Sequence, residues 1–180
     1  MTADRRMRAA MAVVVGATLA GIGLLVVAFI GMARHPAGDT AGPTASTNVS
    51  TSAAPGPSAL AVAVRSWESR AGDHFTQSAR ALEQVSDATE GNDEAGVRAG
   101  CQRLHDTNAV GLQADLPTPD PALTGELQSM IDDINIAAHA CLRFVDARQP
   151  NDATNYQIYL ARAIDHLTTA KRILNDDLGQ

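Results

Sequence analysis

Cysteine is scarce in this chain, since only Cys101 and Cys141 occur among its 180 residues. Neither cysteine belongs to a C-x-x-C pair, so the sequence has no C-x-x-C-H haem-attachment motif. No neighbouring motif would activate either thiol, which argues against a catalytic role for these two residues.

Other motifs of common chemistry are also missing. None of the four histidines in residues 59–180 has an acidic residue three positions before it, so the Glu-x-x-His motif of di-iron bundles is absent. The chain also lacks a His-x-x-x-His pair, a zincin motif, a glycine-rich phosphate loop and a G-x-S-x-G nucleophile elbow. The adjacent pairs Asp132-Asp133 and Asp176-Asp177 are expected to face solvent. The sequence therefore predicts a protein with no catalytic residue, no metal and no cofactor.

Basic residues are also fewer than acidic ones. The chain carries a formal net charge of −6, and residues 59–180 alone hold 18 acidic and 10 basic side chains, or −8. Such a surface argues against binding a nucleic acid or an anionic lipid surface through bulk charge.

The most informative feature that is present is an uncharged run of 24 residues, 9–32, preceded by Arg5, Arg6 and Arg8. As an α-helix this run would span roughly 36 Å, enough to cross a bilayer core of about 30 Å. It is too long for the apolar region of a cleaved signal peptide, which is the alternative. No cysteine follows it closely, which excludes a lipoprotein anchor. We therefore expect a transmembrane signal anchor.

The basic residues predict how this span is oriented. Three arginines precede it, whereas Arg34 is the one that follows it closely. The positive-inside rule then places residues 1–8 in the cytoplasm and the chain after the span outside, in a single-pass protein of the cell membrane. Ala12, Gly16 and Ala20 recur at every fourth position, a spacing that would let two spans pack as a homodimer. The alternative is that alanine and glycine are simply common here.

A linker is expected at residues 33–58. Twenty of the 25 residues from 34 to 58 are Ala, Ser, Thr, Pro or Gly, and Val49 is the only larger aliphatic residue. Such a segment buries too little apolar surface to offset its ordering entropy, so it is predicted to be disordered. A plain spacer is the favoured interpretation, with O-glycosylation as the alternative.

Residues 59–180 form the single folded domain that we expect outside the membrane. Apolar residues recur three and four apart throughout, and no segment keeps a period of two. The sequence thus predicts an all-α domain with helices over about 59–90, 93–115, 121–148 and 152–178. Because all three connections are short, neighbouring helices must run antiparallel, as in an up-down-up-down four-helix bundle.

Local residues mark the breaks between these helices. Gly91 is expected to end the first helix in a left-handed conformation, and Asn92 to cap the second. Asp120 is expected to cap the third helix with Pro121 at its first position. Residues 149–152 repeat this stop and restart before the fourth helix.

The two cysteines lie on the apolar stripes of the second and third helices. In an oxidising compartment such a pair usually forms a disulfide, so we predict a Cys101–Cys141 bond. Folding the hairpin about residue 118 places Cys101 level with residue 135 or so, which leaves an axial offset of several residues. Two inert buried thiols are the alternative.

Three further side chains are candidate site residues. His74 lies on the apolar stripe of the first helix, and folding about Gly91 places it opposite Asn108. A buried imidazole needs a hydrogen-bond partner, and an Asn amide can supply one, so a structural His74–Asn108 bond is predicted. The alternative is a ligand pocket near His74, Asn108 and Trp67. Trp67 is expected to pack in the core at the end of the bundle nearer the membrane, or to line an entrance to that core.

The overall plan resembles the small membrane-anchored exported proteins of actinobacteria, of the mycobacterial type. Shared features are an arginine-bearing N-terminus, one anchor, a small-residue linker and an alanine-rich helical domain. The most specific residues are Cys101-x-x-Leu104, Pro119-Asp120-Pro121 and Cys141. This resemblance implies an envelope location and no particular activity.

The favoured functional expectation is a non-catalytic envelope protein whose bundle binds another protein or supports an assembly. Apolar residues off the stripes, namely Val110, Ile136 and Ile158, would mark a partner surface. The alternative is a bundle that binds a small molecule or a metal in a core pocket near His74. An enzyme is the third alternative.

Overall fold

The computed structural model describes residues 56–180, which are helical along most of their length. No strand occurs in this part of the chain, so the all-α class is confirmed for it. The four helices are α2 (Pro57–Glu90), α3 (Glu94–Asp106), α4 (Pro121–Ala147) and α5 (Pro150–Leu178). Helix α2 begins two residues before the expected domain boundary, and α5 begins at Pro150 rather than near Asp152. The expected span at 9–32 and most of the expected linker lie outside the described residues.

None of the helices within residues 56–180 has both the length and the hydropathy needed to cross a membrane.

Aspartate side chains cap two of the helices. As predicted, Asp120 precedes α4 and accepts a hydrogen bond from the Leu123 N–H at 2.7 Å, with Pro121 in the first turn. The α2–α3 turn differs from the prediction, because Asp93 rather than Asn92 caps α3, accepting from the Gly96 N–H at 3.0 Å.

Backbone angles explain the difference at this turn. Asn92 takes the left-handed conformation with φ of 54°, whereas Gly91 stays right-handed with φ of −75°. Asparagine tolerates positive φ better than most residues, so the left-handed residue of this turn is Asn92. The next residue, Asp93, is then placed to cap the N-terminus of α3. Helix α4 also ends with a left-handed residue, Arg148, at φ of 53°.

Helix α3 continues into a π-helical segment at Thr107–Leu112. This wider turn was not expected from the sequence. Thr107 and Asn108 are both buried there, so the segment presents two consecutive side chains to the interior. Such π-helical turns are rare and often occur at functional sites, which directs attention to what these residues contact.

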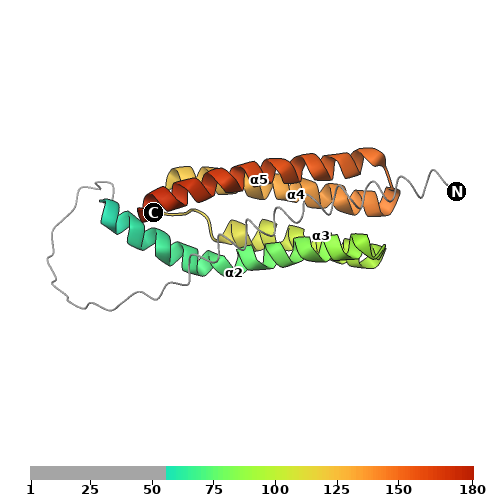
Figure 1. Cartoon of the computed structure of the whole chain (residues 1–180), viewed down its shortest axis with the longest axis horizontal. Helices are drawn as coiled ribbons and strands as arrows, with labels where there is room; N and C mark the ends of the chain where they lie inside the picture. The colour runs from blue at the N-terminus through green and yellow to red at the C-terminus, as the bar shows by residue number, and fades with distance from the viewer. Residues whose placement is uncertain (1–55) are drawn as a thin grey trace.

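The helices form an antiparallel ring in sequence order (Figure 1). Each packs against the next along the chain, and α2 closes the ring against α5 over a shorter stretch than α4 shares with α5. The α2–α3 and α4–α5 turns lie together at one end, which we call the distal end. The start of α2 and the end of α5 lie at the other (Figure 1).

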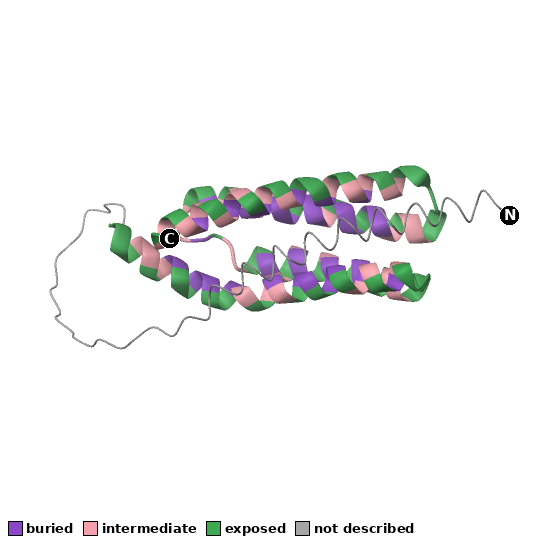
Figure 2. Cartoon of the chain, viewed as in Figure 1, coloured by how far each residue is buried: buried purple, intermediate pink, exposed green. Residues whose placement is uncertain are grey.

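The buried residues lie mainly on the sides of the helices that face one another (Figure 2). Most of the predicted apolar stripes are buried, but α2 differs at one position. Phe75 is 2% exposed, whereas the side chain of His74 is 34% exposed, so the assignment of His74 to the core was wrong. Either residue fits the helical spacing after Ala71, and burying the larger apolar ring is the more favourable choice.

A disulfide joins α3 to α4, as predicted. Cys101 and Cys141 have their Cα atoms 6.2 Å apart, and both side chains are buried. The expected axial offset disappears because residues 115–120 are not a tight reversal. Cys101 lies about 20 Å along the helix from Ala114, and Cys141 lies about 30 Å from Pro121 at ~1.5 Å per residue. The connection therefore runs roughly 10 Å further along the bundle axis, away from the two cysteines, before α4 begins.

Candidate functional site

The described chain contains two distinct polar regions that bear on function. One surrounds Asp115, just after the π-helical segment that continues α3, and includes the residues that the sequence singled out. The other is a pocket at the distal end, around Tyr156 of α5. Their geometry differs in how much space adjoins the polar groups.

Asp115 connects two of the predicted site residues. The His74 Nδ1 atom forms a hydrogen bond with Asp115 Oδ2 at 2.7 Å. The Trp67 Nε1–H donates to the backbone oxygen of the same aspartate at 2.8 Å, and Trp67 is only 1% exposed. Trp67 is thus a core residue, and its ring also meets Phe75 edge to face at 6.5 Å. We call Trp67, His74 and Asp115 the Asp115 cluster.

The predicted His74–Asn108 hydrogen bond was wrong, because Asn108 has other partners. Its Nδ2 group donates to Ser78 Oγ and to the Leu104 carbonyl oxygen, both at 2.7 Å. Asn108 is fully buried within the π-helical segment, and its Oδ1 atom has no hydrogen-bond partner. The residue therefore ties α3 to α2. Sequence reasoning missed Asp115 as the histidine's partner, although Asp115 follows Leu112 at helical spacing.

Little space adjoins the Asp115 cluster. A Cβ atom on Gly111 would lie 2.8 Å from His74 Cδ2, so the imidazole occupies the room that this glycine leaves. A cavity of about 30 Å³ is lined by residues that include Ser78, Asn108 and Leu112. That volume holds about one water molecule. Neither His74 nor Trp67 lines this cavity or the larger pocket described next.

A larger pocket of about 180 Å³ opens at the distal end, among the terminal turns of all four helices. Its walls are mainly apolar, and both small and half-buried side chains contribute to them. The apolar wall residues are Val85, Ala88, Val97, Phe144, Val145 and Ala153. The disulfide-bonded Cys141 also lines the pocket, so the covalent link between α3 and α4 holds part of its wall.

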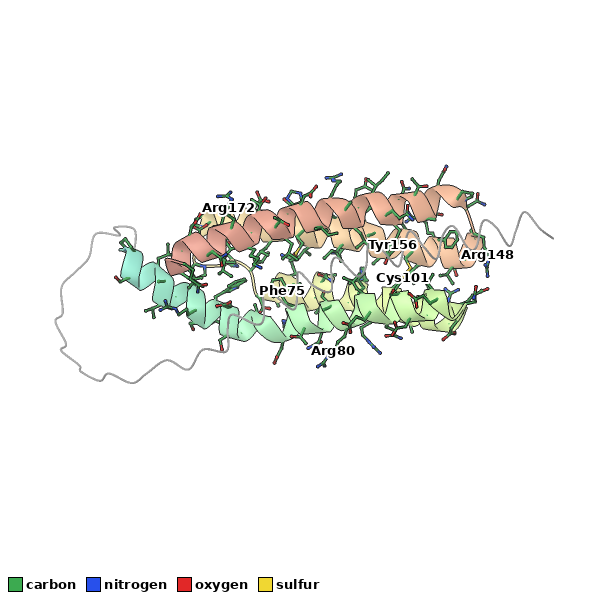
Figure 3. The ribbon with its side chains drawn as sticks, viewed as in Figure 1. Phe75, Arg80, Cys101, Arg148, Tyr156 and Arg172 are labelled. Atoms are coloured by element: carbon green, nitrogen blue, oxygen red, sulfur yellow. A yellow bond between two sulfur atoms is a disulfide. The ribbon has the colours of Figure 1, made fainter. Side chains whose placement is uncertain are left out.

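Tyr156 lines this pocket and carries a buried polar group. The residue is 5% exposed, and its hydroxyl oxygen is buried without a hydrogen-bond partner. Burial raises the pKa of Tyr156 well above its ordinary value, so the group is a neutral hydroxyl that can donate and accept. Figure 3 shows Tyr156 in the same half of the bundle as Cys101 and Arg148. Tyr156 is one of the apolar-stripe residues of the helix expected at 152–178, but the spacing alone carries no sign of a cavity beside it.

Ion pairs surround the mouth of the pocket. The Arg148 guanidinium pairs with the Glu94 carboxylate, which joins the α4–α5 connection to the start of α3. Arg98 and Asp146 form a second α3–α4 pair nearby at 2.6 Å. Both pairs are substantially exposed, so each contributes little to stability. Their main effect is that Arg98, Arg148, Glu94 and Asp146 at this end are already paired with opposite charges.

A third polar group lies between α4 and α5. Asp133 is 4% exposed, which makes the expectation of a solvent-facing residue wrong. Its Oδ2 atom lies 3.2 Å from Arg162 Nε and 3.7 Å from His166 Nε2, and His166 Nδ1 lies 2.8 Å from Glu126 Oε2. These contacts crosslink two helices that already pack along their length. We interpret this group as structural.

Asp177 is also less solvated than expected. Its Oδ2 atom is buried without a hydrogen-bond partner. Burial raises the pKa of Asp177, and the nearby carboxylates of Asp120 and Asp176 raise it further.

Across residues 56–180, no three His, Cys, Asp or Glu side chains are grouped so that they would hold a metal ion. Comparison with protein-family models, curated proteins and solved structures finds no match to this chain.

Proposed function

We propose that residues 59–180 are a non-catalytic binding module that takes up a small apolar molecule in the distal pocket. The observation that carries this proposal is a mainly apolar pocket of about 180 Å³ among the terminal turns of all four helices. An apolar cavity of about 150 Å³ is known to be large enough to bind benzene. This pocket is favoured over the predicted site at His74, Asn108 and Trp67, because the cavity beside Asn108 holds only about one water molecule.

The proposal includes a location outside the cell membrane, with residues 9–32 as the anchor and 33–58 as the linker. It is supported by the three arginines that precede the span and by the resemblance to anchored exported proteins of actinobacteria. A disulfide in the domain suits an oxidising compartment. Protease treatment of intact spheroplasts tests this topology, because an external domain would be degraded while the cytoplasm stays sealed.

Site-resolved NMR tests ligand binding in the full-length chain. Valine methyl groups would be labelled with carbon-13 in protein held in lipid nanodiscs, and toluene would be titrated. We expect saturable shifts at Val85, Val97 and Val145, which line the pocket, and none at Val64 in the other half of α2. Absence of a saturable shift at the pocket methyls would contradict the proposal.

Two tryptophan substitutions on α5 provide a matched pair for that titration. Ala153→Trp places a large ring in the pocket wall and should abolish the toluene shifts. Ala161→Trp adds the same ring at an exposed position on the same helix and should leave them unchanged.

A protein partner is the second candidate function, in keeping with an envelope-assembly role. It is favoured by three large apolar side chains that are exposed as expected: Val110 at 70%, Ile136 at 41% and Ile158 at 50%. Native mass spectrometry of the full chain, extracted gently without reductant, distinguishes the two candidates. A stoichiometric protein lost on Ile158→Asp would favour a partner surface, whereas a retained small molecule lost on Ala153→Trp would favour the pocket.

A further inference from the structure

We infer that His105 of α3 and His139 of α4 form a surface site for a divalent transition metal, copper(II) in particular. The two imidazole rings meet across the interface of these helices, with their centroids 4.7 Å apart and their planes at 60°. His139 is exposed and His105 is partly exposed, so ions in solvent can reach the pair. The inference does not depend on the distal pocket, so it can fail while the proposed function holds.

This histidine pair differs from the other side-chain pairs on the solvent side of the same interface. Nearer the distal end, Arg98 and Asp146 form an ion pair at 2.6 Å. Nearer the other end, Gln113 and Gln128 exchange two hydrogen bonds, each of 2.9 Å. Both of these pairs are complementary, whereas the two imidazoles are alike and share no hydrogen bond in the described chain. Imidazole is a ligand that suits copper, nickel and zinc.

Each ring keeps a nitrogen atom available for a metal. The His105 Nδ1 atom lies 3.2 Å from Asp106 Oδ1, and a carboxylate can only accept, so Nδ1 carries the proton. The lone pair of His105 is then on Nε2, and a carboxylate that fixes the tautomer in this way is typical of metal-bound histidine. Neither ring nitrogen of His139 has a hydrogen-bond partner among residues 56–180.

The separation of the rings suits one ion between them. A metal bound about 2.0–2.1 Å from a ring nitrogen lies about 3.2 Å from the centroid of that ring. Two rings at this distance, with centroids 4.7 Å apart, subtend an angle of about 95° at the metal. An angle near a right angle fits the tetragonal geometry of copper(II) better than the tetrahedral geometry of zinc. Water would fill the remaining positions, so a third protein ligand is not required.

The disulfide holds the two helices together beside this pair. Cys101 precedes His105 by one helical turn, and Cys141 follows His139 by two residues. Because a covalent bond links α3 to α4 at this level, their spacing is set before an ion binds. Binding then loses less conformational freedom than it would between two independent helices.

The charges around the pair do not oppose a cation. Asp106 contributes a negative charge next to His105. Arg143 lies one turn after His139 on α4, but its guanidinium is paired with Asp152 at 2.9 Å. Residues 59–180 as a whole carry a net charge of −8, which also attracts cations.

Copper(II) titration of the full-length chain in nanodiscs of zwitterionic lipid tests this site. Glycine competes for the ion and sets the scale of affinity, and pulsed EPR counts the bound imidazoles from the modulation by their remote nitrogens. The wild type is compared with His105→Ala, with His139→Ala and with His166→Ala in α5 as the control. Urea unfolding without copper checks the fold of each variant, and His139→Ala changes an exposed side chain outside the core.

The wild type should bind copper(II) through two imidazoles. His105→Ala and His139→Ala should each leave at most one imidazole at this site and weaken binding about tenfold or more. His166→Ala should change neither result. A single imidazole in the wild type, or an affinity that either of the two site variants leaves unchanged, would indicate an adventitious ion only and overturn the inference.

Discussion

The Asp115 cluster and the distal pocket both bring polar groups into an apolar bundle, but they do so differently. Trp67 and His74 both form hydrogen bonds with Asp115, and the cavity beside Asn108 and Leu112 measures only about 30 Å³. At the distal end, the Tyr156 hydroxyl is unpartnered beside a pocket of about 180 Å³. Hydrogen-bonded polar groups in a filled space point to a structural role, whereas an open, mainly apolar pocket points to a ligand.

Packing explains why the two regions differ. Around the Asp115 cluster the large rings of Trp67 and Phe75 fill the space between the helices. At the distal end two chain turns separate the helix termini, and Ala88 and Ala153 stand where larger side chains would close the gap. Protein interiors are normally close-packed, so a pocket of this size reflects the residues at that end.

The largest expected effect concerns the disulfide. Replacing both cysteines by serine should lower the free energy of unfolding by about 4 kcal/mol, because a loop of 40 residues is no longer closed in the unfolded chain. Since Cys141 also lines the pocket, toluene binding should weaken in the same variant. Urea unfolding with and without reductant measures the loss, and the double variant should not respond to reductant. Equal stability of both proteins would show that the bond contributes nothing.

Removing a satisfied polar group should cost more than removing an unsatisfied one. Trp67→Phe should lower stability by about 2 kcal/mol, because it removes buried area and leaves the Asp115 carbonyl without its donor. Tyr156→Phe removes a hydroxyl that has no partner, so stability should stay the same or rise. Urea midpoints measure both. A larger loss for Tyr156→Phe would mean that its hydroxyl is satisfied within the protein, and the contrast would fail.

Two glycine substitutions test how tightly His74 is held. Gly111→Ala should lower stability by about 1 kcal/mol, because the new Cβ would lie 2.8 Å from His74 Cδ2. Gly125→Ala in α4 meets no atom within 4 Å, so it should raise stability by about 0.5–1 kcal/mol through helix propensity. Combining Gly111→Ala with His74→Ala should remove the clash. If the loss at Gly111 persists in that double variant, the imidazole is not its cause.

The smallest expected effect is a pH dependence one residue beyond Trp67. Burial raises the pKa of Glu68 from 4.5, with Arg65 partly offsetting the rise, and its Oε1 atom has no partner. The folded state therefore binds the proton more tightly than the unfolded state. The contribution of Glu68 is most favourable below about pH 4.5 and is lost as the pH rises through the raised folded value.

Glu68→Gln should accordingly stabilise the protein by up to about 1 kcal/mol at pH 7 and by less at pH 4. Urea unfolding at the two pH values measures this, with the exposed Glu83→Gln as the control. A gain that does not depend on pH would rule out ionisation of Glu68 as the cause.

Much of the fold was predictable from local patterns, whereas the site was not. The spacing of apolar residues and the Asp120-Pro121 break predicted four helices and their order. At His74 the same spacing failed, because two adjacent residues fit the stripe and only packing selects Phe75. At Asn92 and Asp93 the turn was predicted but the roles were displaced by one residue. Which of two adjacent residues is buried or caps a helix depends on contacts with residues that are distant in the sequence.

By itself, the sequence determined the all-α class and the antiparallel order, and it predicted the pairing of Cys101 with Cys141. These features follow from periodicity, short connections and residue type, which are local properties of the chain. Only the tertiary structure decided that His74 bonds to Asp115, that Asp133 is buried and that Tyr156 adjoins a pocket. Each of these depends on the space between helices, because burial and unpaired hydrogen-bond donors are set by side chains that are distant in sequence.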